Sequence, residues 1–287
     1  MERIKLAIEK AKAGEGDSIW SSSAPSSRRA DGVEDPVATG GAKGHHEPVP
    51  SDLGALEYTQ TATVALDEAH LERHRVIAQQ KSHMASWAFD VLRTQVLQKM
   101  DENGWRTLAV TSPSVESGKT VVSINLAISI AQQPNRTALL VDFDLRRPSV
   151  ARYLGLDRTV SLNDFLDGHA NIDEALVNPG IERFVVLPTN EPVIGASEVL
   201  SSAKVGNLVG ELRERYSDRI VVFDLPPVLA ADDVMSVLPR VDCVLLVVGS
   251  GVSTQSEVEE SMNRLSKANL LGVVLNKDEA PAQNAYY

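Results

Sequence analysis

Short apolar runs alternate with segments of helical periodicity over the second half of the sequence. The apolar runs predict strands at Thr107–Thr111, Thr137–Asp142, Phe184–Leu187, Ile220–Asp224, Cys243–Val248 and Leu271–Asn276. Helical spacing between them predicts helices at Thr120–Gln132, Lys204–Tyr216 and Thr254–Leu265. Nearly continuous apolar strands that alternate with helices are typical of a mostly parallel sheet covered on both faces. We therefore expect an α/β fold that binds its ligand at the carboxyl ends of the strands.

The pattern is weaker before residue 107. Ile4, Ala7, Ile8 and Ala11 recur at helical spacing and predict a short amphipathic helix over residues 1–13. Residues 14–54 are rich in Ser, Gly, Pro and Ala and have almost no large apolar residue, so we expect a disordered tether. Residues 55–280 form the expected domain, and residues 281–287 a flexible tail.

Two further elements are expected at the start of this domain. Tyr58–Leu66 alternates weakly and predicts a strand or an arm that lies on the domain. A helix is expected from about Ser82 to Met100, with an apolar stripe of Trp87, Val91, Leu92, Val96 and Leu97.

Composition narrows the possible functions. With 287 residues, of which 43% are hydrophobic and 23% charged, the chain can bury one sizeable core. The net charge of −11 argues against nucleic acid or an anionic membrane face as the main partner. The single cysteine, Cys243, lies in an apolar run and is expected to be a small buried hydrophobe. No run approaches the roughly 20 apolar residues of a membrane span, which predicts a cytoplasmic protein.

The segment between the predicted strand Thr107–Thr111 and the next helix has the pattern of a phosphate-binding loop. Its backbone N–H groups would face the phosphates, Lys119 would reach the terminal phosphates, and the Thr120 hydroxyl would bind magnesium. Pro113 stands where the motif has its first glycine, and Gly118 is the one glycine left. The expected nucleotide contacts are Ser114, Val115, Glu116, Ser117, Gly118, Lys119, Thr120 and Val121.

Carboxylates end two other apolar strands. Asp142 and Asp144 are followed by Arg146 and Arg147, a sequence that suits a site where a cation and an anion meet. Asp224 ends another strand, and Pro226 and Pro227 follow it. Each of these residues alone would more often be a strand-ending cap or a solvated charge. Because three strand ends deliver them together with Lys119, the set predicts a metal nucleotide site.

These motifs resemble those of the bacterial tyrosine kinases, or BY-kinases, that accompany capsule and exopolysaccharide export. The resemblance spans Tyr58–Lys277 and depends on the phosphate loop and on the runs Leu139–Pro148, Val221–Val228 and Leu271–Lys277. It implies a P-loop fold, ATP as substrate, Mg²⁺ as cofactor, and phosphoryl transfer to tyrosines of a neighbouring subunit. It also implies activation by a transmembrane polysaccharide co-polymerase that recruits the kinase to the inner face of the membrane.

The resemblance also assigns roles to individual residues. It makes Lys119 the phosphate lysine, and Thr120 and Asp142 ligands of magnesium, with Asp224 completing the metal shell. Asp144 becomes the catalytic carboxylate that orients the attacking tyrosine or accepts its proton, and Arg146 joins it in the catalytic set. Asn276 and Lys277 become contacts on the adenine side. The phosphoacceptors would be Tyr286 and Tyr287.

The sequence departs from the family pattern in two places. The phosphate loop has Val115 and Glu116 where the family has proline and glycine, and Ser117 where it has glutamate. The helix near residue 90 keeps Arg93, but Trp87 and Asp90 stand where the family has charges that pair across a ring-shaped oligomer. We therefore expect assembly of a ring through this helix to be weakened.

Two other functions remain open. A regulatory partition-type ATPase would share the fold, although the second lysine typical of that class would fall at Ser114. A pseudokinase that binds nucleotide and acts as a scaffold of the export complex is the other, because the phosphate loop is altered. In all three cases we expect no nucleic-acid partner.

Overall fold

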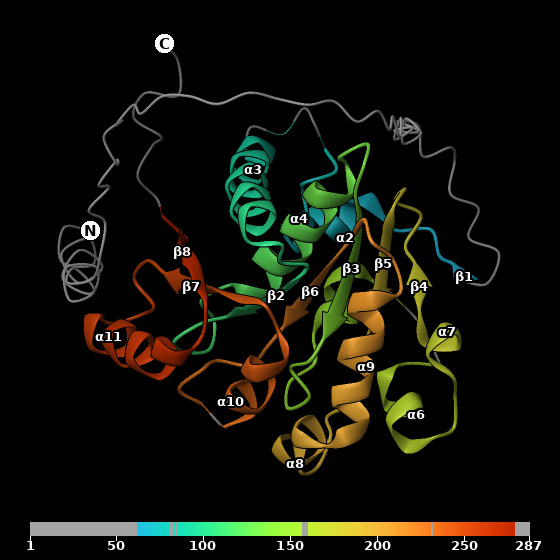
Figure 1. The fold of residues 1–287 in the computed structure, drawn as a ribbon. Coiled ribbons are helices and arrows are strands. Elements are labelled where there is room, and N and C mark those ends of the chain that lie inside the picture. The colour runs from blue at the N-terminus through green and yellow to red at the C-terminus, as the bar shows by residue number, and fades with distance from the viewer. Residues whose placement is uncertain (1–61, 81–82, 84, 157–159, 231, 279–287) are drawn as a thin grey trace, which may run out of the picture.

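An eight-stranded sheet runs through the described part of the chain, with strand order β1-β4-β5-β3-β6-β2-β7-β8 (Figure 1). The structure is a computed structural model and describes residues 62–80, 83, 85–156, 160–230 and 232–278. The predicted helix 1–13, the tether 14–54 and the tail 281–287 lie outside these residues. The strands are β1 (Ala62–Thr63), β2 (Thr107–Thr111), β3 (Thr137–Asp142), β4 (Val177–Asn178), β5 (Phe184–Leu187), β6 (Arg219–Asp224), β7 (Cys243–Gly249) and β8 (Leu270–Asn276).

All six predicted strands are present, with ends that agree to within one residue. Neighbouring strands are parallel except for the antiparallel pair β4 and β5. β1 lies inside the segment Tyr58–Leu66, which was expected to be a strand or an arm. β4 has only two residues, too few to show a period in the sequence. The expected P-loop class of mostly parallel α/β fold is confirmed.

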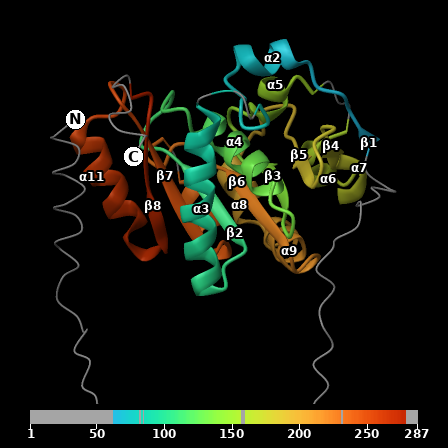
Figure 2. The same ribbon diagram turned by 90° about the horizontal axis from the view of Figure 1, so that it is seen from above.

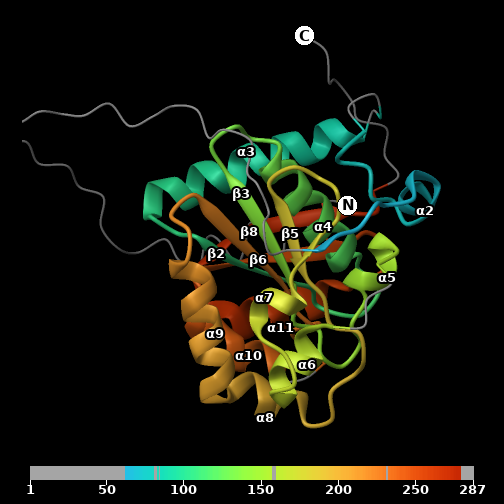
Figure 3. The ribbon, with the colours of Figure 1, turned by 90° about the vertical axis from the view of Figure 1, so that its right-hand side faces the viewer.

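Helices cover both faces of the sheet, with α3 on one side and α8, α9 and α10 on the other (Figure 3). Seen from above, α2 lies beside α5 (Figure 2). The helices are α2 (Glu68–Arg73), α3 (Ser86–Asn103), α4 (Lys119–Ala131), α5 (Val150–Leu154), α6 (Leu162–Asp167), α7 (Ile172–Ala175), α8 (Ala196–Ser201), α9 (Ala203–Glu214), α10 (Asp233–Val237) and α11 (Gln255–Arg264). Short 3₁₀ turns follow α10 at Leu238–Arg240 and α11 at Leu265–Lys267.

The central strands are buried on both faces because alternate side chains point to opposite sides of the sheet. On β3, Leu140 packs into the cluster beneath α3 and α4, whereas Leu139 and Val141 pack into the cluster beneath α8 and α9. Cys243 is buried in the first cluster, as expected, and burial raises the pKa of its thiol to about 12. Within the described residues, no helix is both long and apolar enough to cross a membrane.

The predicted apolar stripe of α3 is wrong at Trp87, whose side chain is 58% exposed. The buried positions of this helix are Ser86, Val96 and Met100. Trp87 and Val96 are nine positions apart, and at 3.6 residues per turn this separation is about two and a half turns. The two side chains therefore lie on opposite sides of the helix, so burying Val96 exposes Trp87.

Candidate functional site

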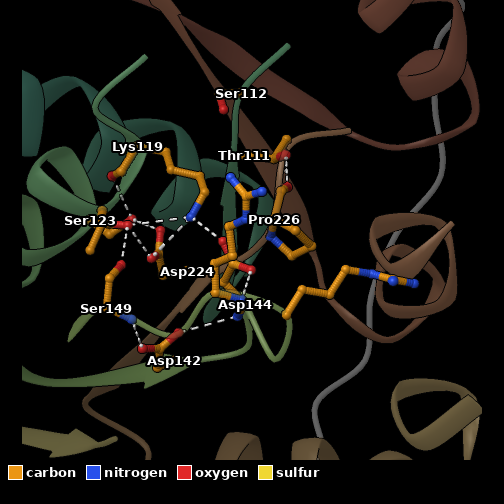
Figure 4. A network of polar contacts seen from close by, with 12 residues as sticks. Thr111, Ser112, Lys119, Ser123, Asp142, Asp144, Ser149, Asp224 and Pro226 are labelled. Atoms are coloured by element: carbon orange, nitrogen blue, oxygen red, sulfur yellow. Dashed lines mark hydrogen bonds and ion pairs between the residues drawn. The ribbon is translucent and has the colours of Figure 1, made fainter. Parts of the chain in front are cut away.

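The carboxyl ends of β2, β3 and β6 bring the predicted site residues together. Asp142 on β3 is paired in register with Asp224 on β6, which is in turn paired with Val110 on β2. β2 leads through the phosphate loop into α4, whose first residues are Lys119 and Thr120. Figure 4 shows these side chains pointing toward one another from the three strand ends.

Lys119 joins the acidic side chains of the site. Its ammonium group lies 2.8 Å from Asp144 Oδ2 and 3.4 Å from Asp224 Oδ2, and its residue is 9% exposed. Burial alone would lower the pKa of Lys119, but the charges of Asp224 and Asp144 outweigh it and raise that pKa above its ordinary value. Lys119 is therefore a fixed cation in the middle of the site.

Asp224 binds the hydroxyl groups of α4. Its Oδ2 accepts a hydrogen bond from Thr120 at 2.6 Å, and its Oδ1 accepts one from Ser123 at 2.9 Å. Burial raises the pKa of Asp224, although Lys119 and the two hydroxyl groups oppose this. Ser123 was not among the predicted site residues, yet its position four residues after Lys119 places it on the same face of the helix.

Asp142 is held by the backbone at the start of α5. The N–H groups of Ser149 and Val150 each donate to its Oδ2 at 2.9 Å, and the N–H of Asp144 donates to its Oδ1 at 3.2 Å. Burial, followed by the charge of Asp224, raises the pKa of Asp142 to about 8, against the opposing effect of these N–H groups and Lys119. A divalent cation in this position would favour the ionised carboxylate.

The phosphate loop reaches its shape with one non-glycine residue in the left-handed region. Glu116 has a φ of 64° and an exposed side chain, and Gly118 has a φ of 86°. The carbonyl of Ser114 accepts hydrogen bonds from the hydroxyls of Ser112 and Ser117. Val115 is 47% exposed, and Val121 is half-buried in the first turn of α4. The loop thus presents its backbone at the N-terminus of a helix, which favours anions.

Asn276 lies against this loop rather than in open space. Its side-chain nitrogen donates to the carbonyl of Ser117 at 2.9 Å. A Cβ atom at Gly118 would lie 2.2 Å from the same nitrogen, so a larger residue at that position would have to displace the Asn276 side chain. Lys277, the next residue, is exposed with a φ of 59°.

Arg146 does not join the cluster around Lys119. Its Nε and Nη2 donate to the two carboxylate oxygens of Asp233 at 2.7 and 3.0 Å, and Nη2 also donates to Ser197 at 3.1 Å. Asp233 and Ser197 were missed by the sequence analysis. Their sequence neighbourhoods carry no motif, and only the packing of α8 against α10 brings them to Arg146.

Oxygen donors at the centre of the site suit magnesium. The Thr120 hydroxyl and the carboxylates of Asp142 and Asp224 are hard ligands. In the described ranges, no three or more His, Cys, Asp and Glu residues form a group that could hold a metal ion. Mg²⁺ commonly takes only one or two carboxylates and completes its shell with water and substrate phosphates, so the donor set fits that ion. Tyr286 and Tyr287 lie outside the described residues.

A family model supports the interpretation of this site. The model of the CobQ/CobB/MinD/ParA nucleotide binding domain matches residues 108–286. The chain belongs to this family. Within it, the curated relatives include proteins named as bacterial tyrosine kinases, and the resemblance expected from the motifs is therefore confirmed.

Two of these relatives show how far the similarity extends. The putative tyrosine-protein kinase CapB of Staphylococcus aureus is 27% identical over 201 residues, which are 69% of this chain and 87% of CapB. The tyrosine-protein kinase wzc of Salmonella typhi is 33% identical over 195 residues, which are 67% of this chain. The chain matches only 27% of wzc, and likewise only 24% of the Ralstonia solanacearum protein EpsB.

Solved structures show the same relationship. The kinase domain of the Escherichia coli tyrosine kinase ETK is 28% identical, with a TM-score of 0.67 over 79% of this chain and 93% of that one. The VpsO kinase domain is 26% identical, with a TM-score of 0.63 over 74% of this chain and 100% of that one. The septum site-determining protein MinD of Pyrococcus horikoshii, at 23% identity and a TM-score of 0.51, shares the fold.

Proposed function

We propose that this chain is an ATP-dependent protein-tyrosine kinase that phosphorylates tyrosines of a neighbouring copy, Tyr286 and Tyr287 among them. The observation that carries the proposal is the cluster in which Lys119 contacts both Asp144 and Asp224, with Thr120 bound to Asp224. The proposal is supported by the relatives of this chain, which are named as tyrosine kinases. The residues of the cluster supply the parts that phosphoryl transfer needs.

In this proposal, Lys119 changes partners when the nucleotide binds. The ammonium group now held by Asp144 at 2.8 Å would contact the terminal phosphates. Asp144 would then be free to accept the proton of a tyrosine hydroxyl as that oxygen attacks the γ-phosphorus. The γ-phosphoryl group of ATP would pass to the tyrosine oxygen as the bond between the γ-phosphorus and the β–γ bridging oxygen breaks. ADP would leave, and the tyrosine proton would move to the Asp144 carboxylate.

ATP and Mg²⁺ are the proposed substrate and cofactor. Thr120, Asp142 and Asp224 would hold the ion, which would neutralise the charge on the phosphates. Residues 114–121 would bind the phosphates, with Asn276 and Lys277 on the adenine side. A MinD of the same fold is described as complexed with Mg-ADP, which is in keeping with this assignment.

We further propose a role in regulating the synthesis and export of capsule or exopolysaccharide. A transmembrane co-polymerase would recruit the kinase to the inner face of the membrane and activate it. This part of the proposal is supported by the resemblance of the motifs to BY-kinases. The absence of a membrane-spanning helix from the described residues is consistent with it.

Labelled ATP tests the proposed activity. The purified protein is incubated with γ-labelled ATP and Mg²⁺, alongside Lys119→Ala and the double variant Tyr286→Phe/Tyr287→Phe. We expect label on the wild type, loss of at least about a hundredfold in Lys119→Ala, and loss in the tyrosine variant. Lys204→Ala is the matched control, because Lys204 lies on the surface of α9, where it donates to the carbonyl of Leu166 and lies over the ring of Phe165.

The same assay separates the other two functions. Release of phosphate without label on the protein would contradict the kinase and support a regulatory ATPase. Nucleotide binding with neither signal would support a scaffold. If the wild type is labelled only after the cytoplasmic segment of a co-polymerase is added, both the kinase activity and its activation by that partner are supported.

A further inference from the structure

Asp233 holds Arg146 at the edge of the site, away from the Lys119 cluster. The carboxylate of Asp233 is 0% exposed and accepts two hydrogen bonds from the Arg146 guanidinium, whereas the Arg146 side chain is 50% exposed. Such a bidentate pair fixes the plane of the guanidinium as well as its position. The side of Arg146 that faces solvent is therefore presented in one orientation.

Both acids of this region come from the same segment. Asp224 ends β6, and Asp233 begins α10 after the loop that contains Pro226 and Pro227. The Thr111 hydroxyl donates to the carbonyl of Pro226 at 2.7 Å and ties this loop to the end of β2. The position of Arg146 is thereby fixed relative to the metal ligands.

One segment that holds Arg146 also exposes an apolar side chain. Ile194, three residues before Ser197, is 99% exposed. The N–H of Val193 donates to the carbonyl of Leu145, so the loop with Ile194 is bound next to Arg146. Arg147 is exposed in the same turn. Arg146, Arg147 and Ile194 are thus held on segments adjacent to Asp144, the proposed catalytic carboxylate.

We propose that Arg146 and Ile194 form an acceptor rim that binds the tyrosine-bearing segment of a second copy, and that Asp233 is the positioning residue of this rim. The inference rests on the proposed kinase function and adds the surface that would receive the protein substrate. Within the described residues, Nη1 of Arg146 makes no hydrogen bond, which leaves it for an acidic group of the substrate. The Ile194 side chain would contact the aromatic ring.

The sequence of residues 278–287 has the matching chemistry. It contains Asp278 and Glu279, then mostly small residues, and then Tyr286 and Tyr287. In a chain of net charge −11, adjacent exposed guanidiniums are a specific place for an acidic segment to bind. A rim with a fixed cation and an exposed apolar side chain would therefore distinguish this segment from other surface loops.

Peptide binding tests the rim without requiring phosphoryl transfer. A fluorescent peptide with the sequence of residues 278–287 is titrated with the full chain in the presence of Mg-ADP, and anisotropy is measured. We expect Arg146→Gln and Asp233→Asn each to raise the peptide Kd about tenfold, the effect of losing one charge-assisted hydrogen bond. Ile194→Ser is expected to raise it about threefold, as for loss of a partly buried apolar contact. Asp232→Asn, an exposed neighbouring acid, is the control and should change nothing.

A double-mutant cycle separates positioning from general support of the fold. If Asp233 acts through Arg146, the double variant should bind peptide no more weakly than Arg146→Gln. In kinase assays of Asp233→Asn, the KM for the peptide should rise while kcat and the nucleotide affinity stay within about twofold of the wild type. Asp233→Glu should recover part of the peptide affinity.

Several results would overturn the proposal. Unchanged peptide affinity in Arg146→Gln and Ile194→Ser would remove the rim, and both variants are at exposed positions that should fold normally. If Asp233→Asn lowers both the nucleotide affinity and the melting temperature while Arg146→Gln changes neither, the role of Asp233 is purely structural. Peptide binding by the wild type without any labelling would instead contradict the kinase and leave the rim in place.

Discussion

At the residue scale, the phosphate loop shows how one substitution is accommodated. Glu116 stands where the related kinases have glycine, and its φ of 64° is in the left-handed region. A residue with a Cβ atom pays about 1 kcal/mol for that conformation. The side chain is exposed, so the carboxylate lies in solvent rather than among the expected phosphates. The altered loop therefore has backbone strain at Glu116, whose side chain stays in solvent.

We predict that Glu116→Gly binds Mg-ATP about threefold more tightly than the wild type, because an exposed charge near an anion is worth a few tenths to 1 kcal/mol. Isothermal titration calorimetry measures the affinity. Glu116→Gln is the matched control, since it removes the charge and keeps the Cβ atom. Equal affinities in all three proteins would show that neither charge nor backbone conformation at position 116 limits binding.

At the element scale, one buried amide ties the segment after α2 to the core. The Asn125 side chain on α4 accepts hydrogen bonds from the N–H groups of Ile77 and Ala78, at 2.8 and 2.9 Å. It also donates to the carbonyls of Arg75 and Val121. Asn125 is 0% exposed, so its side chain is the buried acceptor for the N–H groups of Ile77 and Ala78.

We predict that Asn125→Ala lowers the free energy of unfolding by about 2–4 kcal/mol, since it leaves two buried N–H groups without partners. Urea denaturation followed by circular dichroism measures the change. Asn103→Ala provides the control, because Asn103 is exposed and donates only within its own helix, to the carbonyl of Lys99. If the two variants lose the same free energy of unfolding, the hydrogen bonds of Asn125 do not contribute more to stability than those of an exposed side chain.

At the scale of the whole molecule, the residues of α3 determine whether copies of the chain can associate through this helix. Arg93 donates to Asp90 at 2.7 Å and to the carbonyl and hydroxyl of Ser129, at 3.2 and 3.1 Å. Arg93 is thus engaged within this chain, whereas the resemblance to BY-kinases implies an arginine that pairs between subunits. Trp87 is exposed on the outer side of the same helix, where it offers no charge to a neighbour.

We predict that the protein forms no stable ring through α3 at micromolar concentration, as measured by light scattering. The double variant Trp87→Glu/Asp90→Arg restores the family's charge pattern and should increase the average mass in the same measurement, with an effect that weakens as salt rises. A stable octamer of the wild type would contradict this prediction. If the average mass of the double variant does not change as salt rises, its association does not have an electrostatic basis.

The sequence by itself determined the central strands and the phosphate loop. Buried parallel strands must be continuously apolar, and the turns that follow them carry the polar residues, so both are visible in one dimension. Lys119, Thr120, Asp142 and Asp224 could be assigned together because the carboxyl ends of neighbouring parallel strands meet at one edge. The membership in a family of nucleotide-binding domains followed from the same motifs and is confirmed.

Only the tertiary structure decided which side chains complete the site. Asp233 and Ser197 reach Arg146 through the packing of α8 against α10. The two residues are 36 positions apart, and the sequence between them carries no periodic signal of that contact. The exposure of Trp87 was likewise decided by the face of α3 that packs on the sheet. The physical reason is the same in both cases. Local patterns report whether a residue is apolar or follows a strand, whereas partners distant in sequence are chosen by how whole elements pack.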